Sequence, residues 1–273
     1  MSDISLTEST RANLLATQKT KALIDRTSLR LSTGKRVNEP TDNVRAFILA
    51  KTLTNQAGNL LSVKESIGQS LSAVGGALSG IDSITRLVEQ LKVAANDASD
   101  QTAEIRAVQA ARFDELRAQL DGIATDANYK GVSLLAASPD SLTVTFDKTN
   151  GSSLTISGAA SDSTSLGIGT GAVAFNNFAT DADIQAAIDA LDNAVTTLRS
   201  TAVQLGSNAS ILNTRLDFTQ DLANTIDSAA GKLTGADLNE VAANLLALNV
   251  ARELSVASLT ISNKSQQSIL QLF

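Results

Sequence analysis

Residues 184–233 read IQAAIDALDNAVTTLRSTAVQLGSNASILNTRLDFTQDLANTIDSAAGKL, and this run decides the fold. Its apolar side chains recur at steps of four and three residues, which places them on one face of a helix. Thr180 or Asp181 can cap the start of this helix, and Gly231 and Gly235 favour its end. We therefore predict one long helix with an apolar seam that needs a partner. The seam consists of Ile184, Ile188, Leu191, Val195, Leu198, Ala202, Leu205, Ala209, Leu212, Leu216, Thr219, Ala223, Ile226, Ala230 and Leu233.

A matching seam runs through the first half of the chain. Apolar residues recur there at seven-residue intervals, and a second, mostly apolar row follows three positions later. Two such rows are typical of a coiled coil. Gly75 and Gly76 interrupt the pattern, which indicates either the close approach of another helix or a local kink. The first row consists of Ala46, Leu53, Leu60, Ile67, Val74, Ile81, Val88 and Ala95.

Shorter helices precede and follow this second seam. Apolar residues from Ala12 to Leu29 predict a helix that ends before Gly34, a residue suited to the position after a helix end. Thr41 or Asp42 can cap the helix that follows. The spacing of Phe113, Leu116, Leu120, Ile123 and Ala127 predicts another short helix.

The middle and the end of the chain carry two further elements. Alternating apolar residues on both sides of Asn150-Gly151, within residues 142–156, predict a β-hairpin. A last helix begins near Asp237 and has two apolar faces. The first face consists of Leu238, Val241, Leu245 and Leu248, and the second of Leu246, Val250, Leu254, Ala257 and Ile261.

The order of these elements is roughly symmetric about the β-hairpin. We predict a mainly α fold, a long antiparallel coiled-coil helical hairpin with a small β-hairpin region in the middle of the chain, at the turn-around tip. In the alternative, the seams bury each other within one monomeric bundle. The apolar chain end, with Ile269, Leu272 and Phe273, argues against a strictly monomeric protein because it would stay exposed to water.

The composition excludes several classes of function. The 273 residues include no Cys and no His, which removes thiol and imidazole chemistry, disulfides and the usual zinc sites. The net charge is −6 and no stretch is strongly basic, so nucleic acid is not expected as a partner. The start shows no signal-peptide pattern, and no uninterrupted apolar stretch reaches bilayer length. We expect no catalytic residue, cofactor, metal or membrane insertion.

Three blocks of the chain, in this order, resemble conserved blocks of bacterial flagellins. LSTGKRVNEPTDNVRAFILA (31–50) resembles the N-terminal block, where a helix breaks at Ser/Thr-Gly and restarts after an acidic cap. IATDANYKGVSLL (123–135) resembles the next block, with Tyr129-Lys130-Gly131 where the family has Phe-Asn-Gly. GADLNEVAANLLALNVARELSVASLTISNKSQQSILQLF (235–273) resembles the C-terminal block. The short middle resembles compact alphaproteobacterial flagellins that lack large outer domains.

The resemblance implies a division of the chain into five segments. The expected segments are an N-terminal inner-core helix and connecting spoke (1–43), the N-terminal part of a helical assembly domain (44–137), a β-hairpin and exposed variable region (138–180), the C-terminal part of the assembly domain (181–235) and a C-terminal inner-core helix (236–273).

The resemblance also implies two sets of assembly residues. The assembly seam consists of Leu53, Leu60, Ile67, Val74, Ile81, Val88, Ile188, Leu191, Val195, Leu198, Leu205, Leu212, Leu216 and Ile226. The terminal inner-core set consists of Leu15, Leu23, Leu29, Leu254, Ile261, Ile269, Leu272 and Phe273.

The function that this resemblance implies is a structural subunit that polymerises into the flagellar filament for swimming motility. The chain's main partner is then itself, as a helical homopolymer. Further expected partners are an export chaperone, a filament cap protein and hook-associated junction proteins. The expected location is extracellular, after export without a cleaved signal peptide. A hook–filament junction protein is the alternative, because it shares the terminal blocks, and a secreted toxin-like or adhesin coiled coil is a third class.

Overall fold

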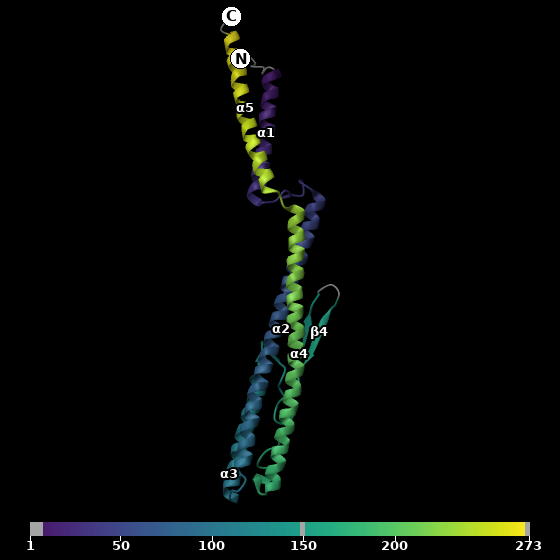
Figure 1. Cartoon of the computed structure of the whole chain (residues 1–273), viewed down its shortest axis with the longest axis vertical. Helices are drawn as coiled ribbons and strands as arrows, with labels where there is room; N and C mark the ends of the chain where they lie inside the picture. Colours follow the sequence, from purple (N-terminus) through teal and green to yellow (C-terminus); the bar gives the residue numbers. More distant parts are fainter. Residues whose placement is uncertain (1–7, 148–150, 271–273) are drawn as a thin grey trace, which may run out of the picture. The chain divides into compact units, whose positions relative to one another are not determined.

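The computed structural model describes residues 8–147 and 151–270, which fall into two units. One unit combines the chain up to Ala57 with the chain from Asn224 onward, and the other is Gly58–Ala223. The described residues form five α-helices, and two of them, α2 and α4, contribute to both units (Figure 1). The helices are α1 (Glu8–Thr33), α2 (Val44–Asp97), α3 (Ala103–Asp126), α4 (Asp181–Thr234) and α5 (Leu238–Leu270).

Two antiparallel hairpins lie between α3 and α4 in the sequence. Strands β3 (Ser141–Thr145) and β4 (Ser153–Ser157) form the predicted hairpin, which is confirmed. Strands β1 (Asn128–Tyr129) and β2 (Val132–Ser133) form a smaller one that the sequence did not predict. Its two-residue loop has φ of 52° at Lys130 and 84° at Gly131. Positive φ at both loop residues matches the twist of a tight hairpin.

Within Gly58–Ala223, α2 and α4 run antiparallel and their seams share one core. The Lys64 Nζ donates to Gln220 Oε1 at 2.5 Å, and the Lys92 Nζ donates to Asp192 Oδ1 at 2.6 Å, which fixes the antiparallel register. Between these bridges the two seams bury each other within one chain, so the predicted antiparallel helical hairpin is confirmed for this unit. The buried members include Ile67, Val74, Ile81, Val88, Leu191, Leu198, Leu205 and Leu212.

Helix α3 holds the long segment between β4 and α4 with polar side chains. Asp121 accepts hydrogen bonds from Ser163 N at 2.7 Å and from Ser163 Oγ at 2.9 Å. Asp114 accepts from Gly171 N at 2.7 Å, and Arg117 Nε donates to Ile168 O at 2.9 Å. Region 138–180 is therefore not an exposed region throughout, because its second half is built onto α3 and buries Ser161, Ser163, Leu166, Ile168, Phe175 and Phe178.

A left-handed turn, η1 (Asn176–Phe178), precedes α4. Its three residues have φ of 46°, 53° and 57°, a conformation that costs about 1–2 kcal/mol per residue without glycine. Phe178 offsets this cost by packing edge-on against Phe113, with ring centroids 5.5 Å apart. The Arg106 Nη1 also donates to Phe178 O at 3.3 Å. Tertiary contacts thus impose a turn that local sequence disfavours.

The β3–β4 hairpin does not lie at a turn-around tip, which corrects the expectation from the sequence. The Phe146 ring lies beneath the Arg215 guanidinium, with its centroid 5.0 Å from Cζ. Arg215 is 34 residues beyond the start of α4 at Asp181, or about 50 Å along the helix. The hairpin therefore lies alongside α4, where Figure 1 shows β4.

The ends of α2 and α4 agree with the sequence to within one or two residues, whereas α1 and α3 begin earlier than the apolar spacing from Ala12 and from Phe113 indicated. Asn43 caps α2, because its Oδ1 accepts from Ala46 N at 2.9 Å, whereas Thr41 or Asp42 was expected. Thr180 caps α4 as predicted, since its Oγ1 accepts from Asp183 N at 3.3 Å. The helix then continues through Gly231 to Thr234 instead of stopping at the first glycine.

The glycines of α2 differ in their surroundings: one is tightly packed against other residues, and two lie on open surface. A Cβ added at Gly80 would lie 2.8 Å from Ala127 Cβ and 2.8 Å from Leu135 Cδ1, so glycine is needed there. A Cβ at Gly75 or Gly76 would meet nothing within 4 Å, and α2 is continuous through both. Neither interpretation of these two glycines, close approach within the chain or a kink, is therefore right for the single chain.

These contacts predict opposite effects for two similar substitutions. We expect Gly80→Ala to lower the free energy of unfolding by about 1–3 kcal/mol because the added methyl is overpacked. We expect Gly76→Ala to raise it by about 0.5–1 kcal/mol, because alanine is the better helix former and clashes with nothing. Thermal melts followed by circular dichroism compare the two. Equal melting temperatures would refute the close packing at Gly80.

Candidate assembly surfaces

In the unit that contains both ends of the chain, α1 and α5 lie side by side and antiparallel (Figure 1). The half-buried residues Val241, Leu245 and Leu248 mark the face of α5 that packs on α1. They belong to the first of the two apolar faces that the sequence predicted for this helix. The second face is therefore the one that α1 leaves uncovered.

This second face of α5 is open to solvent in the single chain. Leu254 is 66% exposed and Ile261 is 69% exposed. On α1, Leu15, Leu23 and Leu29 are 52%, 47% and 44% exposed. Exposed apolar side chains of this kind mark interaction surfaces, because water stays in contact with them until a partner covers them.

Three members of the predicted terminal set cannot be placed in this surface. Leu272 and Phe273 lie outside the described residues. Ile269 belongs to α5, but its side chain is also outside what the structure describes.

Helix α5 is long and apolar enough, over Leu238–Ser265, to cross a membrane by length and composition, and none of its most apolar window is buried. The criterion of an uninterrupted apolar run misses this helix, because a membrane-spanning helix tolerates some polar residues. One such helix is weak evidence for a membrane span, since a helix covered by protein on two sides has the same composition. The absence of membrane insertion stays an expectation.

The two connections of this unit, α1 to α2 and α4 to α5, are bonded to each other. Gly34, with φ of 67°, ends α1 as the sequence predicted. The chain then turns so that Arg36 N and Val37 N both donate to Thr234 O, at 2.6 and 3.2 Å. Ala236 N donates to Gly34 O at 3.0 Å, and Val37 is buried. These bonds fix the points at which α1 leads into α2 and α4 leads into α5.

Asp42 organises the turn that follows. Its Oδ2 accepts from Asn38 N at 3.0 Å and from Glu39 N at 3.3 Å, and its Oδ1 lies 3.5 Å from Arg30 Nη2. The hydrogen bond from the Asn38 amide is the main cause that lowers the pKa of Asp42 below its usual 3.8, with help from Glu39 N and Arg30. The Asp42 carboxylate thus stabilises the turn at Asn38 and Glu39 and does not cap a helix, as the sequence suggested it would.

This geometry predicts a pH-dependent contribution to stability. Because the folded pKa of Asp42 is lowered, its contribution is complete above about pH 4 and is lost as pH falls through the folded pKa. We expect Asp42→Asn to melt at a lower temperature than the wild type at pH 7, and the gap to shrink as pH falls below 4. Glu39→Gln is the control, since the Glu39 side chain is exposed. A gap that persists unchanged at pH 2 would contradict this role.

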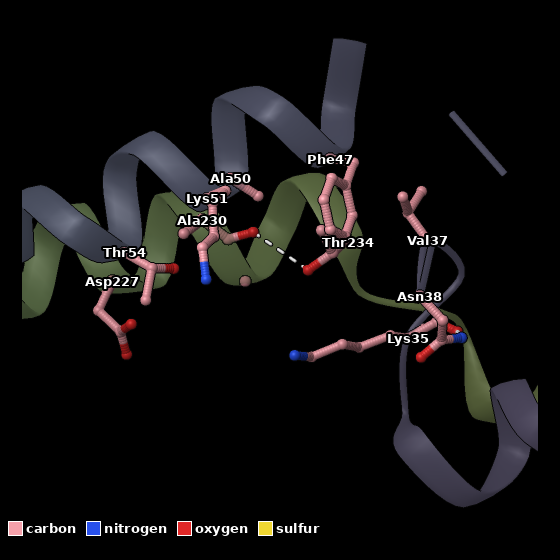
Figure 2. Close-up of a pocket in the computed structure, with 11 residues that line it drawn as sticks. Lys35, Val37, Asn38, Phe47, Ala50, Lys51, Thr54, Asp227, Ala230 and Thr234 are labelled. Atoms are coloured by element: carbon pink, nitrogen blue, oxygen red, sulfur yellow. Dashed lines mark hydrogen bonds between the residues drawn. The ribbon is translucent and has the colours of Figure 1, made fainter. Parts of the chain in front are cut away.

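A half-open groove lies beside these connections, between the start of α2 and the end of α4 (Figure 2). The ammonium groups of Lys35 and Lys51, the carboxylate of Asp227 and the ring of Phe47 line it. The lining consists of Lys35, Val37, Asn38, Phe47, Ala50, Lys51, Thr54, Asp227, Ala230, Gly231 and Thr234.

The predicted assembly seam lies mostly inside the chain. Eight of its members are buried in the core that α2 and α4 share. The other six are half-buried: Leu53, Leu60, Ile188, Val195, Leu216 and Ile226. Side chains covered by their own chain cannot contact a neighbouring copy directly. Any contribution of the buried members to assembly is therefore indirect, through the shape of the unit, and it stays a prediction.

Among the residues that the structure describes, no cluster of three or more Asp and Glu side chains could hold a metal ion. The exposed apolar faces of α1 and α5 are the candidate assembly surfaces of the unit that holds the chain ends. The two-face pattern of α5 was readable in the sequence. The bonding between the two connections was not, because it joins residues about 200 positions apart.

Comparisons with known proteins show which family the sequence is similar to. Two family models match the chain: the bacterial flagellin N-terminal helical region over residues 4–140, and the bacterial flagellin C-terminal helical region over residues 188–273. The chain is 32% identical to Flagellin FljM of Caulobacter vibrioides over 93% of this chain and 92% of that protein. It is 26% identical to a flagellin of Brucella melitensis over 98% of each.

One solved structure is similar in fold. It is described as a flagellar hook-associated protein from Vibrio parahaemolyticus, with a TM-score of 0.60 over 71% of this chain and 100% of that one. The identity is 14%, so this likeness concerns the fold alone.

Proposed function

The chain belongs to the bacterial flagellin family, as a structural subunit of the flagellar filament, and we propose that it assembles through surfaces that a single copy leaves uncovered. The observation that carries this proposal is the exposed apolar face of α5 at Leu254 and Ile261, together with Leu15 and Leu23 on α1. Covering these side chains with sister copies removes apolar surface from water, which drives association.

The five segments then have distinct roles. The helices of 1–43 and 236–273 form the inner core of the filament, and the connections around Gly34 and Thr234 set the angle at which they leave. Residues 44–137 and 181–235 form the helical assembly domain. Residues 138–180 brace that domain through α3 and the left-handed turn. The buried packing of Phe178 and Ser163 supports this bracing role.

The remaining parts of the proposal concern export and partners. The chain leaves the cell for the extracellular filament, without a cleaved signal peptide, and meets an export chaperone, a filament cap protein and hook-associated junction proteins. It carries out no catalysis. The hook–filament junction alternative is not favoured, because the full-length relatives described above are flagellins.

The test uses purified full-length chain and a variant that stops at Gly235, before α5. We expect the full chain to elongate into filaments from short filament seeds, as seen by electron microscopy and by sedimentation. The shortened chain should stay in the supernatant at the same concentration. Equal polymerisation of both forms would contradict the role of α5, and a full chain that forms no filament would contradict assembly itself.

A further inference from the structure

A row of exposed residues follows the side of α4 that faces away from the core. Helical geometry places these positions opposite Leu198, Leu205 and Leu212, which are buried. Its three large apolar members, Val203, Ile211 and Phe218, are 73%, 43% and 56% exposed. The row carries no charged side chain. This outer stripe consists of Thr196, Ser200, Val203, Ser207, Ile211, Thr214 and Phe218, all exposed.

The side of α2 that faces away from the same core carries small side chains instead of large ones. Between Gly68 and Ser79 the centre of this side carries only glycine and serine, and Gln69, which accepts a hydrogen bond from Lys130, lies at its edge. A Cβ at any of its glycines would meet nothing within 4 Å, so the packing of the chain itself gives no reason for them. Glycine weakens a helix interior, and here the single chain gains nothing in return. This small-residue face consists of Gly68, Ser72, Gly75, Gly76 and Ser79.

The two surfaces lie at the same level along the unit, and both face away from its core. The bridges from Lys64 to Gln220 and from Lys92 to Asp192 fit one antiparallel register. In that register, residues 68–79 of α2 are level with residues 205–216 of α4. The outer stripe and the small-residue face therefore lie at the same level on two different helices, each on the side away from the core.

We propose that the outer stripe of α4 docks on the small-residue face of α2 in a second copy of this chain. Val203, Ile211 and Phe218 project from one surface, and the glycines of the other let a helix approach closely. Both surfaces are uncharged, so the contact leaves no charge buried without a partner. Because the two surfaces differ and lie on different helices, each copy can bind one neighbour through each surface, which extends an array instead of closing a dimer.

This inference rests on the proposed assembly and adds to it a specific pair of surfaces. The α1 and α5 helices belong to the other unit, so the two sets of contacts can be altered separately. Substitutions on the α2 and α4 surfaces leave Leu254 and Ile261 unchanged.

Two double variants test the contact, one on each surface. Gly75→Gln with Gly76→Gln fills the small-residue face, and Val203→Lys with Phe218→Lys places charge on the outer stripe. Matched controls lie on α3, where Gly122 also has nothing within 4 Å of an added Cβ and Val108 is 67% exposed. The controls are Gly122→Gln and Val108→Lys. Full-length monomers are compared by thermal melts, and elongation from wild-type seeds is measured by sedimentation.

We expect the glycine variant to melt at or above the wild-type temperature, yet to need at least about tenfold more protein to elongate. The lysine variant should show the same loss of elongation, and both controls should elongate like the wild type. If the glycine variant elongates like Gly122→Gln, the proposed contact is wrong, whereas the proposed function stands as long as the wild type polymerises. A wild-type chain that does not polymerise would overturn both.

Discussion

Leu212→Asp is expected to unfold the unit Gly58–Ala223 at temperatures where the wild type is intact. Leu212 is fully buried between α2 and α4, so an aspartate there is either an unpaired buried charge or a protonated group without partners. Such changes cost about 3–5 kcal/mol. For a unit of this size that corresponds to a fall in melting temperature of about 10 °C or more. Circular dichroism melts of the monomer measure it directly.

The control for this variant is one residue away. Asn213 is exposed on the same helix, so Asn213→Asp adds the same charge without burying it. It should melt within a few degrees of the wild type. Loss of filaments in Leu212→Asp would then follow from loss of the folded unit. A Leu212→Asp monomer as stable as the control would contradict the packing of the two seams.

Leu254→Asp combined with Ile261→Asp is expected to abolish filament formation while leaving the monomer intact. Both side chains are about two-thirds exposed, so the substitutions should change monomer stability by about 0.5 kcal/mol or less. In a filament that covers this face, each charge would be desolvated without a partner at a cost of several kcal/mol. That cost weakens association by at least about 100-fold. Electron microscopy and sedimentation of the purified variant test this.

Leu254→Met with Ile261→Val keeps the same face apolar and serves as the matched control. These changes conserve most of the buried volume and should allow filaments to form. Normal filaments from the double aspartate variant would show that neighbouring copies do not cover this face of α5.

The long helices could be predicted from the sequence because their signal is repeated many times. The four-three spacing from Ile184 to Leu233 leaves one plausible conformation, and α4 spans Asp181–Thr234. The seven-residue spacing from Ala46 to Ala95 likewise anticipates α2. The sequence left open whether these seams meet within one chain or between chains. The hydrogen bonds of Lys64 and Lys92 across α2 and α4 show that the seams meet within one chain.

The elements that were missed depend on contacts between distant residues. Strands β1 and β2 have two residues each, too few for an alternating pattern. The left-handed turn at Phe178 forms because Phe113 and Arg106 hold it from α3. Asp114 and Asp121 accept hydrogen bonds from backbone amides and a hydroxyl of the segment before α4, and no local spacing in the sequence indicates these contacts.

The candidate surfaces, too, were predicted from the sequence only in part. Two apolar faces on α5 are visible as spacing, with Leu245 on one and Leu254 on the other. Which face meets α1 depends on the pairing of the two helices, so only the structure identifies Leu254 as exposed. The uncharged stripe with Val203 and Phe218 gives no strong periodic signal, because polar Ser and Thr side chains separate its apolar members.

The central claim is that sister copies cover the apolar faces that one chain leaves open. Hydroxyl-radical footprinting of full-length protein, as monomer and as filament, measures the accessibility of individual side chains. We predict that Leu15, Leu254 and Ile261 react readily in the monomer and are protected severalfold in the filament. Leu212 should be protected in both states. Filaments in which Leu254 and Ile261 remain as reactive as in the monomer would contradict the account.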